Sequence, residues 1–127
     1  MNGSKFIFDT NILLLYLQGK LKTQNINFDI EEIGISIITK IEYLINPSLG
    51  VNDIHLFEEF ESNINVYFLT PDDDAIFTET IKIRKKYKLK LPDSIIAATS
   101  MANNATLISA DNIFSKIFNL KFQLIKV

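Results

Sequence analysis

Four acidic side chains are spaced along the chain so that they could form one metal site. Three follow the ends of predicted strands and the fourth opens a predicted helix: Asp9, Glu42, Asp111 and Asp93. Carboxylates gathered in one place repel one another and stay ionised only when a cation compensates them. Hard oxygen ligands, in a chain without cysteine, favour Mg²⁺ or Mn²⁺, which in proteins act on phosphates. The chemistry this pattern predicts is metal-activated attack of water on a phosphodiester.

Each acid also has a purely structural interpretation. Asp9 and Asp111 could cap the helices that follow them, because Asp is a favoured N-cap residue. Thr39 and Glu42 fit the T-x-x-E capping box, with Glu42 at the third helical position. Asp93 could be stabilised by the positive end of its own helix. Both interpretations stay open for each acid taken singly, whereas their joint occurrence near strand ends favours a site.

Alternating strands and helices would position these acids. Runs of β-branched and aromatic residues bounded by polar ones predict strands at residues 5–8, 34–38, 66–69, 106–109 and 121–127. Apolar spacing and start signals predict helices at residues 12–17, from 39, at 52–61, at 70–87, from 93, and shortly within 110–118. This order predicts an α/β fold, one domain over residues 1–127, with a central, mostly parallel sheet of about five strands. Ligands bind outside the carboxyl ends of such strands, where the acids fall.

The densest acidic cluster is not the predicted site. PDDDA, at residues 71–75, follows Thr70 as an expected cap and begins with Pro71 at the expected first helical position. The helix dipole favours negative charge there, and consecutive helical residues point in different directions, so three in a row chelate poorly. We expect a solvated helix start.

The positive charge of the chain is concentrated in one segment. Six of its 13 Lys and Arg residues lie in KIRKKYKLK, residues 82–90, although the net charge is −2. A solvated helix end would explain this run, because cations complement the helix dipole. A surface that binds a phosphate backbone would explain it as well, with Arg84, Lys85 and Lys88 as the contacts and Tyr87 as a stacking group.

Composition limits the class of protein. The chain has 127 residues, 47% of them hydrophobic, which fits a globular domain with a real core. It has no cysteine, which excludes disulfides and thiolate chemistry and suits a reducing compartment. No signal-peptide pattern opens the sequence, and the longest apolar run, ILLLYL, is far too short for a bilayer. We expect a soluble, cytoplasmic protein without a membrane segment.

Four segments together resemble the PIN domain, specifically the small VapC-like toxin ribonucleases. They run in the order and spacing of that family over nearly the whole chain: FIFDTNILLLYL, ISIITKIEYL, LPDSIIAATSMANNATLISAD and DNIFSKIFNLKFQLI. The third segment is the most specific, because it combines an acid, a small-residue helix, a strand and a second acid. The resemblance implies a PIN-like α/β/α sandwich and an endoribonuclease that depends on Mg²⁺ or Mn²⁺.

The resemblance also implies roles for particular residues. The acids of the family, which would be both catalytic and metal-binding, fall on Asp9, Glu42, Asp93 and Asp111, and the polar residues that support them fall on Asn11 and Ser109. Water activated by the ion would attack in line and leave a 5′-phosphate and a 3′-hydroxyl. The implied partners are an RNA substrate, held by Arg84, Lys85 and Lys88, a cognate antitoxin and a second copy of the chain.

Other functions fit the sequence less well. A phosphatase of the haloacid-dehalogenase type needs D-x-D after its first strand, and here the second position is Asn11. A phospho-receiver domain needs an acidic pair before the first helix and a late lysine after a strand, and neither is evident. A stand-alone RNA-processing nuclease remains an alternative, as does a non-catalytic PIN-like module that binds RNA or protein.

Overall fold

A five-stranded sheet forms the centre of the protein. The computed structural model describes residues 5–21 and 29–126. Its strands are β1 (Phe6–Phe8), β2 (Ile33–Ser36), β3 (Asn65–Tyr67), β4 (Thr106–Ser109) and β5 (Phe122–Leu124). They lie in the order β3-β2-β1-β4-β5, and every neighbouring pair is parallel. The predicted α/β fold with a parallel sheet is confirmed, and the carboxyl ends of all strands share one edge.

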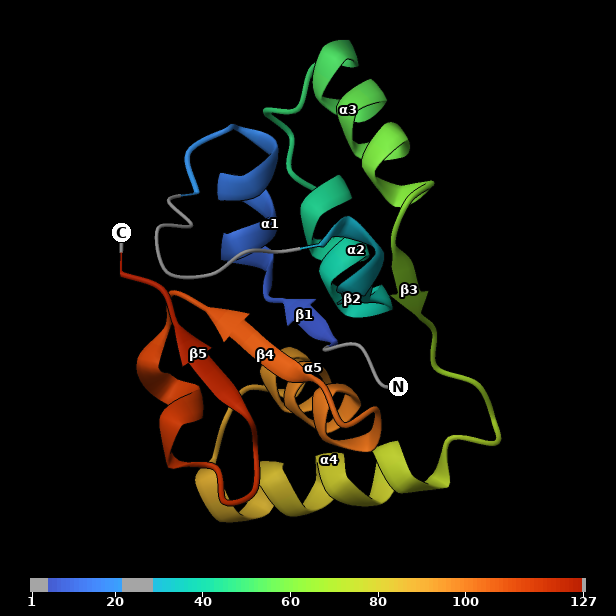
Figure 1. The fold of residues 1–127 in the computed structure, drawn as a ribbon. Coiled ribbons are helices and arrows are strands. Elements are labelled where there is room, and N and C mark those ends of the chain that lie inside the picture. The colour runs from blue at the N-terminus through green and yellow to red at the C-terminus, as the bar shows by residue number, and fades with distance from the viewer. Residues whose placement is uncertain (1–4, 22–28, 127) are drawn as a thin grey trace.

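Helices cover both faces of this sheet (Figure 1). They are α1 (Thr10–Leu17), α2 (Ile37–Leu44), α3 (Val51–Glu61), α4 (Asp74–Tyr87) and α5 (Leu91–Ala102), with short 3₁₀ helices η1 (Ile30–Glu32) and η2 (Asn112–Lys116). Helices α1 to α3 lie on one side of the sheet and α4 and α5 on the other. Among the described residues, no helix is long and apolar enough to cross a membrane.

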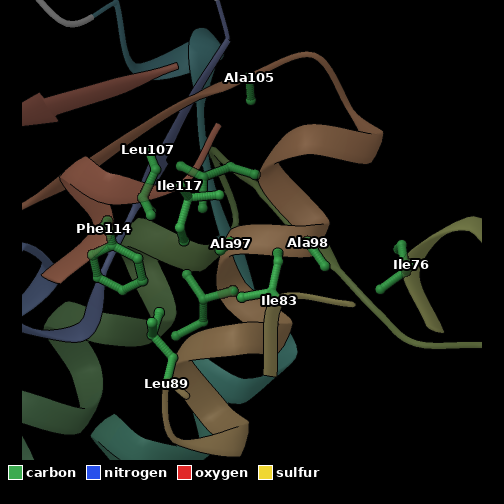
Figure 2. Packing of buried hydrophobic residues seen from close by; sticks show 11 residues of the cluster. Ile76, Ile83, Leu89, Ala97, Ala98, Ala105, Leu107, Phe114 and Ile117 are labelled. Carbon is green, nitrogen blue, oxygen red and sulfur yellow. The ribbon is translucent and has the colours of Figure 1, made fainter. Parts of the chain in front are cut away.

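The core consists of two hydrophobic clusters, one on each face. Successive strand residues point to opposite faces, so Ile7 joins the cluster beneath α4 and α5 while Phe8 joins the cluster beneath α1 and α3. Leu107 and Ile108 of β4 divide in the same way. Figure 2 shows the first cluster, in which the small residues of α5 let the helix pack closely against the sheet and α4.

The start of α2 differs from the prediction. Strand β2 ends at Ser36 rather than at residue 38, because the Ser36 hydroxyl accepts a hydrogen bond from the Ile38 N–H at 3.0 Å and caps α2. Thr39 is therefore not the cap, and the predicted Thr39–Glu42 capping box is wrong. Glu42 lies at the sixth position of α2, beyond the first turn, which leaves its carboxylate without a capping role.

The start of α4 differs as well. Thr70 does not cap the helix and Pro71 is not its first residue, because the chain makes a turn first. The Asp73 carboxylate accepts the Thr70 N–H at 2.7 Å, and α4 begins only at Asp74. Asp72 and Asp74 are exposed, so this acidic segment is a solvated helix start, as predicted. The last strand is shorter than predicted, and Val127 lies outside the described residues.

Candidate active site

Asp9 is a buried carboxylate at the carboxyl end of the central strand. Its side chain is 6% exposed, and its N–H donates to the Ile108 carbonyl of the neighbouring strand β4 at 2.9 Å. Its Oδ1 accepts the Thr10 N–H at 2.8 Å, so Asp9 caps α1. The structural interpretation is therefore correct for this residue. A cap occupies only part of the acceptor capacity of a carboxylate, so it does not exclude a further role.

Asn11 and Ser109 both contact Asp9, from different elements. The Ser109 hydroxyl donates to Asp9 Oδ2 at 2.7 Å, and the Asn11 side-chain amide donates to the same oxygen at 3.4 Å. The Asn11 side-chain oxygen Oδ1 accepts the Ala110 N–H at 3.1 Å, which ties α1 to the end of β4. The two residues that the resemblance assigned to support of the acids thus lie where they restrain the orientation of Asp9.

Glu42 reaches the site from α2. Its Oε1 accepts a hydrogen bond from the Thr10 hydroxyl at 2.6 Å, across 32 residues of sequence. Thr10 is therefore a site residue that the sequence reasoning missed. The available signal was its place between Asp9 and Asn11 at a strand-to-helix junction, where a hydroxyl side chain lies at the sheet edge.

Asp111 and Asp93 complete the group of acids. Asp111 follows β4; its N–H donates to the Ser109 hydroxyl oxygen at 2.9 Å, and its Oδ1 accepts the Ile113 N–H at 3.1 Å, so it caps η2. Asp93 is half-buried in the first turn of α5, behind Pro92. The four acids thus come from four different segments of the chain.

Their charges act on one another. Burial raises the pKa of Asp93, and repulsion from Asp9, Glu42 and Asp111 adds to it, bringing that pKa to about 6 against the opposing effect of Lys90. Burial also raises the pKa of Asp9; hydrogen bonds from Ser109 and Thr10 oppose this effect, and repulsion from Glu42 and Asp111 adds to it. The predicted acids therefore share one electrostatic environment that is short of positive charge.

The donor set suits a hard divalent cation. All four groups offer carboxylate oxygens, the ligands that Mg²⁺ and Mn²⁺ prefer, and a cation would relieve their repulsion. Within the described parts of the chain, however, no three Asp, Glu, His or Cys side chains form a group that could hold a metal ion as they stand. Repulsion acts over a longer range than a ligand bond of about 2.0–2.1 Å. An ion would therefore have to draw the carboxylates closer together.

The predicted basic residues lie on α4 and just after it. Arg84, Lys85 and Lys88 are exposed, and within the described ranges none of them pairs with a carboxylate. Helix α4 ends at Tyr87, its C-cap residue Lys88 adopts a left-handed conformation with φ 59°, and α5 begins three residues after Lys88. This turn brings the basic end of α4 to the end of α5 that carries Asp93.

Tyr87 differs from its neighbours. Its ring packs against the first core cluster and its hydroxyl accepts the Phe118 N–H at 3.0 Å. This side chain anchors α4 to the segment before β5, rather than standing free to stack on a base.

Comparison with known proteins decides the family. The profile of the PIN domain matches residues 6–119, a span that includes all four acids. The chain belongs to the PIN domain family. The resemblance noted in the sequence is thereby confirmed. No curated protein sequence matches the chain.

Solved structures share the fold of this PIN domain over almost its full length. A chain of VapBC2 from Rickettsia felis, bound to a DNA fragment from their promoter, has a TM-score of 0.74 and 19% identity, with 94% of this chain and 97% of that chain covered. A chain of DNA-bound VapBC from Salmonella typhimurium has a TM-score of 0.78 and 18% identity, with 95% of this chain and 98% of that chain covered. A chain of a toxin–antitoxin complex from Klebsiella pneumoniae has a TM-score of 0.69 and 28% identity, with 91% of this chain and 95% of that chain covered. The fold is thus that of PIN domains in toxin–antitoxin complexes.

Proposed function

We propose that this PIN domain is a metal-dependent endoribonuclease and the toxin of a toxin–antitoxin pair. One observation carries the proposal: four carboxylates from separate segments lie at the carboxyl edge of the sheet, where burial and repulsion from the other three raise the pKa of Asp93 to about 6. Burial and repulsion from Glu42 and Asp111 also raise the pKa of Asp9. Holding these carboxylates together lowers the stability of the fold. Within the described residues their structural roles are two helix caps, by Asp9 and Asp111. A bound cation gives the group a use.

Asp9, Glu42, Asp93 and Asp111 would hold the ion, which is Mg²⁺ or Mn²⁺. When bound, such an ion lowers the pKa of a water molecule and neutralises charge on the scissile phosphate. The chain contributes the arrangement of its acids. Ser109 and Asn11 fix the rotation of the Asp9 carboxylate through Oδ2, and Thr10 restrains Glu42. No side-chain nucleophile is needed, because water supplies the attacking oxygen.

The basic end of α4 would hold the RNA backbone. Arg84, Lys85 and Lys88 are exposed and unpaired in the described part of the chain, and the turn after α4 leads directly to Asp93. Contacts to phosphate supply affinity without reading sequence. The choice of RNA would thus depend on other parts of the surface and on the shape of the RNA.

Exposed apolar side chains support protein partners, proposed here as a cognate antitoxin and a second copy of the chain. Phe77, Ile81 and Leu91 are 40%, 55% and 56% exposed and line a shallow apolar pocket of about 200 Å³ between α4 and α5. Ile45 and Val51, beside α2 and α3, are more than 70% exposed. Apolar surface of this kind is typical of protein interfaces. With RNA as the substrate, we propose a cytoplasmic location.

The test of catalysis is cleavage of labelled total RNA by the wild type and by Asp9→Asn, each with Mg²⁺, Mn²⁺ or EDTA. The substitution keeps the capping oxygen and removes the charge. Asp72→Asn is the matched control, because Asp72 is an exposed acid outside the site. Cleavage by the wild type and by Asp72→Asn with metal, but not by Asp9→Asn, is the expected result. Equal cleavage by all three proteins would make Asp9 a cap only.

The toxin assignment needs its own test. Expression of the wild type alone should stop growth of the host cell, whereas Asp9→Asn should not, and co-expression of the product of the adjacent gene should restore growth and co-purify with the chain. Growth unaffected by an active wild-type enzyme would favour a stand-alone RNA-processing nuclease. RNA binding without metal-dependent cleavage would favour a non-catalytic module.

A further inference from the structure

Thr10 contacts two of the four acids at once. Its backbone N–H donates to Asp9 Oδ1 at 2.8 Å, and its hydroxyl donates to Glu42 Oε1 at 2.6 Å. We infer that Thr10 is a positioning residue, whose hydroxyl fixes Glu42 beside Asp9 for ion binding. The inference rests on the proposed function, since it concerns the same site.

The hydroxyl restrains a side chain that would otherwise move. Glu42 is half-buried on α2, and Thr10 provides the one hydrogen bond to its carboxylate among the described residues. The charges of Glu42 and Asp9 repel each other, which favours Glu42 rotamers that point away from the site. A hydrogen bond from a hydroxyl to a carboxylate at this distance is of the strong, charge-assisted kind. Thr10 therefore opposes the repulsion at the place where both acids are needed.

The bond leaves room for a ligand. An ionised carboxylate accepts about four hydrogen bonds or ligands. Glu42 uses one of these positions, and Asp9 uses three, for Thr10, Ser109 and Asn11. Both carboxylates therefore keep acceptor capacity for a cation while their orientation is held by neighbours.

The side chain of Thr10, not its backbone, distinguishes this role from helix capping. Any non-proline residue at this position would supply the N–H that Asp9 accepts. The bond to Glu42 requires a hydroxyl. Thr10→Val keeps the N–H and the branched shape and removes only that group, and Thr10→Ser keeps the hydroxyl.

The experiment measures Mn²⁺ affinity by calorimetry for the wild type, Thr10→Val and Thr10→Ser. Loss of a hydrogen bond to a charged group should weaken binding by about tenfold or more, so Thr10→Val should show that loss. Thr10→Ser should stay within about threefold of the wild type. Thr39→Val is the matched control: Thr39 lies on α2 three residues before Glu42, is fully buried, and its hydroxyl bonds to nothing in the described structure.

Two results would overturn the inference. Thr10→Val could bind Mn²⁺ as tightly as the wild type, which would show that Glu42 needs no restraint. Thr10→Ser could bind as weakly as Thr10→Val, which would assign the effect to the methyl group. The cleavage assay gives a second readout, since kcat should fall with Mn²⁺ affinity in Thr10→Val and recover in Thr10→Ser.

A metal-free measurement separates this inference from the proposed function. If the wild type binds no Mn²⁺, the proposed function fails, and a double-mutant cycle of Thr10→Val and Glu42→Ala in EDTA decides whether the bond couples the two residues. We expect Thr10→Val to lower the unfolding midpoint in the wild type and to have little effect in Glu42→Ala. Additive effects of the two substitutions would overturn the inference about Thr10 as well.

Discussion

The Ser109 hydroxyl donates to Asp9 Oδ2 at 2.7 Å, so the last residue of β4 holds the acid that follows β1. The same hydroxyl oxygen accepts the N–H of Asp111 at 2.9 Å and faces the Asn11 amide at 3.4 Å. Strands β1 and β4 are parallel neighbours, with Phe8 opposite Ile108. One serine thus connects two of the acids through the pairing of their strands.

Ser109→Ala should therefore affect both stability and charge. It removes a buried hydrogen bond to a carboxylate, so we expect the free energy of unfolding at pH 7 to fall by about 1–3 kcal/mol. It also removes a contact that lowers the pKa of Asp9, which should rise further. Urea unfolding and a carboxyl NMR titration measure the two effects. Ser115→Ala, at an exposed hydroxyl, is the control; an unchanged Asp9 titration in Ser109→Ala would contradict the assigned role.

The stability of the metal-free protein should depend on pH through Asp93. Its folded-state pKa of about 6 lies above the ordinary value of 3.8, so the folded state binds the extra proton between these values. The free energy of unfolding in EDTA should therefore rise as the pH falls from 7.5 to 5. The contribution of the Asp93 proton to this free energy should be lost as the pH rises through 6. Asp93→Asn should flatten this dependence and be more stable than the wild type at pH 7.5. A wild type that loses stability from pH 7.5 to 5 would contradict the raised pKa of Asp93.

Divalent cations should stabilise the folded protein. A ligand that binds only the folded state raises its stability by mass action, so Mn²⁺ should raise the unfolding temperature of the wild type and EDTA should reverse the effect. Asp9→Asn and Asp93→Asn should respond less, because each removes one carboxylate. An equal response in the control Asp72→Asn and in these two variants would place the ion elsewhere.

Thr39→Val should stabilise the protein. The Thr39 hydroxyl is fully buried without a hydrogen-bond partner in the described structure, and burial of such a group has a cost. Valine has the same shape, so we expect a gain of about 1 kcal/mol in the free energy of unfolding, measured in urea. Thr99→Val is the comparison, because the Thr99 hydroxyl donates to the Ile95 carbonyl at 2.7 Å. A loss of stability in Thr39→Val would reveal a partner for its hydroxyl.

The basic end of α4 should control the salt dependence of RNA binding. Arg84, Lys85 and Lys88 are changed to Gln in the catalytically inactive Asp9→Asn protein, and RNA binding is measured. The changes should weaken RNA binding and reduce the slope of log affinity against log salt concentration by about 0.7 per lost contact. Lys5 and Lys121 precede β1 and β5, at the opposite edge of the sheet, and their Gln variants are the control. Equal losses per charge in both sets would indicate unspecific attraction.

The sequence predicted the fold well because its signals were local. Short apolar runs such as residues 106–109 and the helix predicted from residue 93, which the structure has at Leu91–Ala102, indicated the alternation that implies a parallel sheet. Two of the boundaries that failed depended on single hydrogen bonds of side chains. Ser36 ended β2 early, and Asp73 delayed α4 by closing a turn with Thr70. Several residues in each segment could have formed such bonds, and the pattern did not select among them.

The candidate site was predictable in part for the same reason. Each acid was found by its place after a strand or at the start of a helix. Thr10 was missed because its bond to Glu42 crosses 32 residues, and spacing along the chain does not show such a contact. Tyr87 was considered for stacking, whereas the fold places its ring against the core and its hydroxyl beside Phe118. Tertiary packing decided both cases.

The central place of β1 has a consequence for protein synthesis. This strand, near the start of the chain, pairs on one side with β2 and on the other with β4, and the contact between Asp9 and Ser109 spans 100 residues. A nascent chain that has emerged only as far as α4 has one edge of β1 open and lacks both Asp93 and Asp111. Domains fold as units during translation. The group of four acids that the proposed activity needs can thus be complete only after residue 111 has left the exit tunnel.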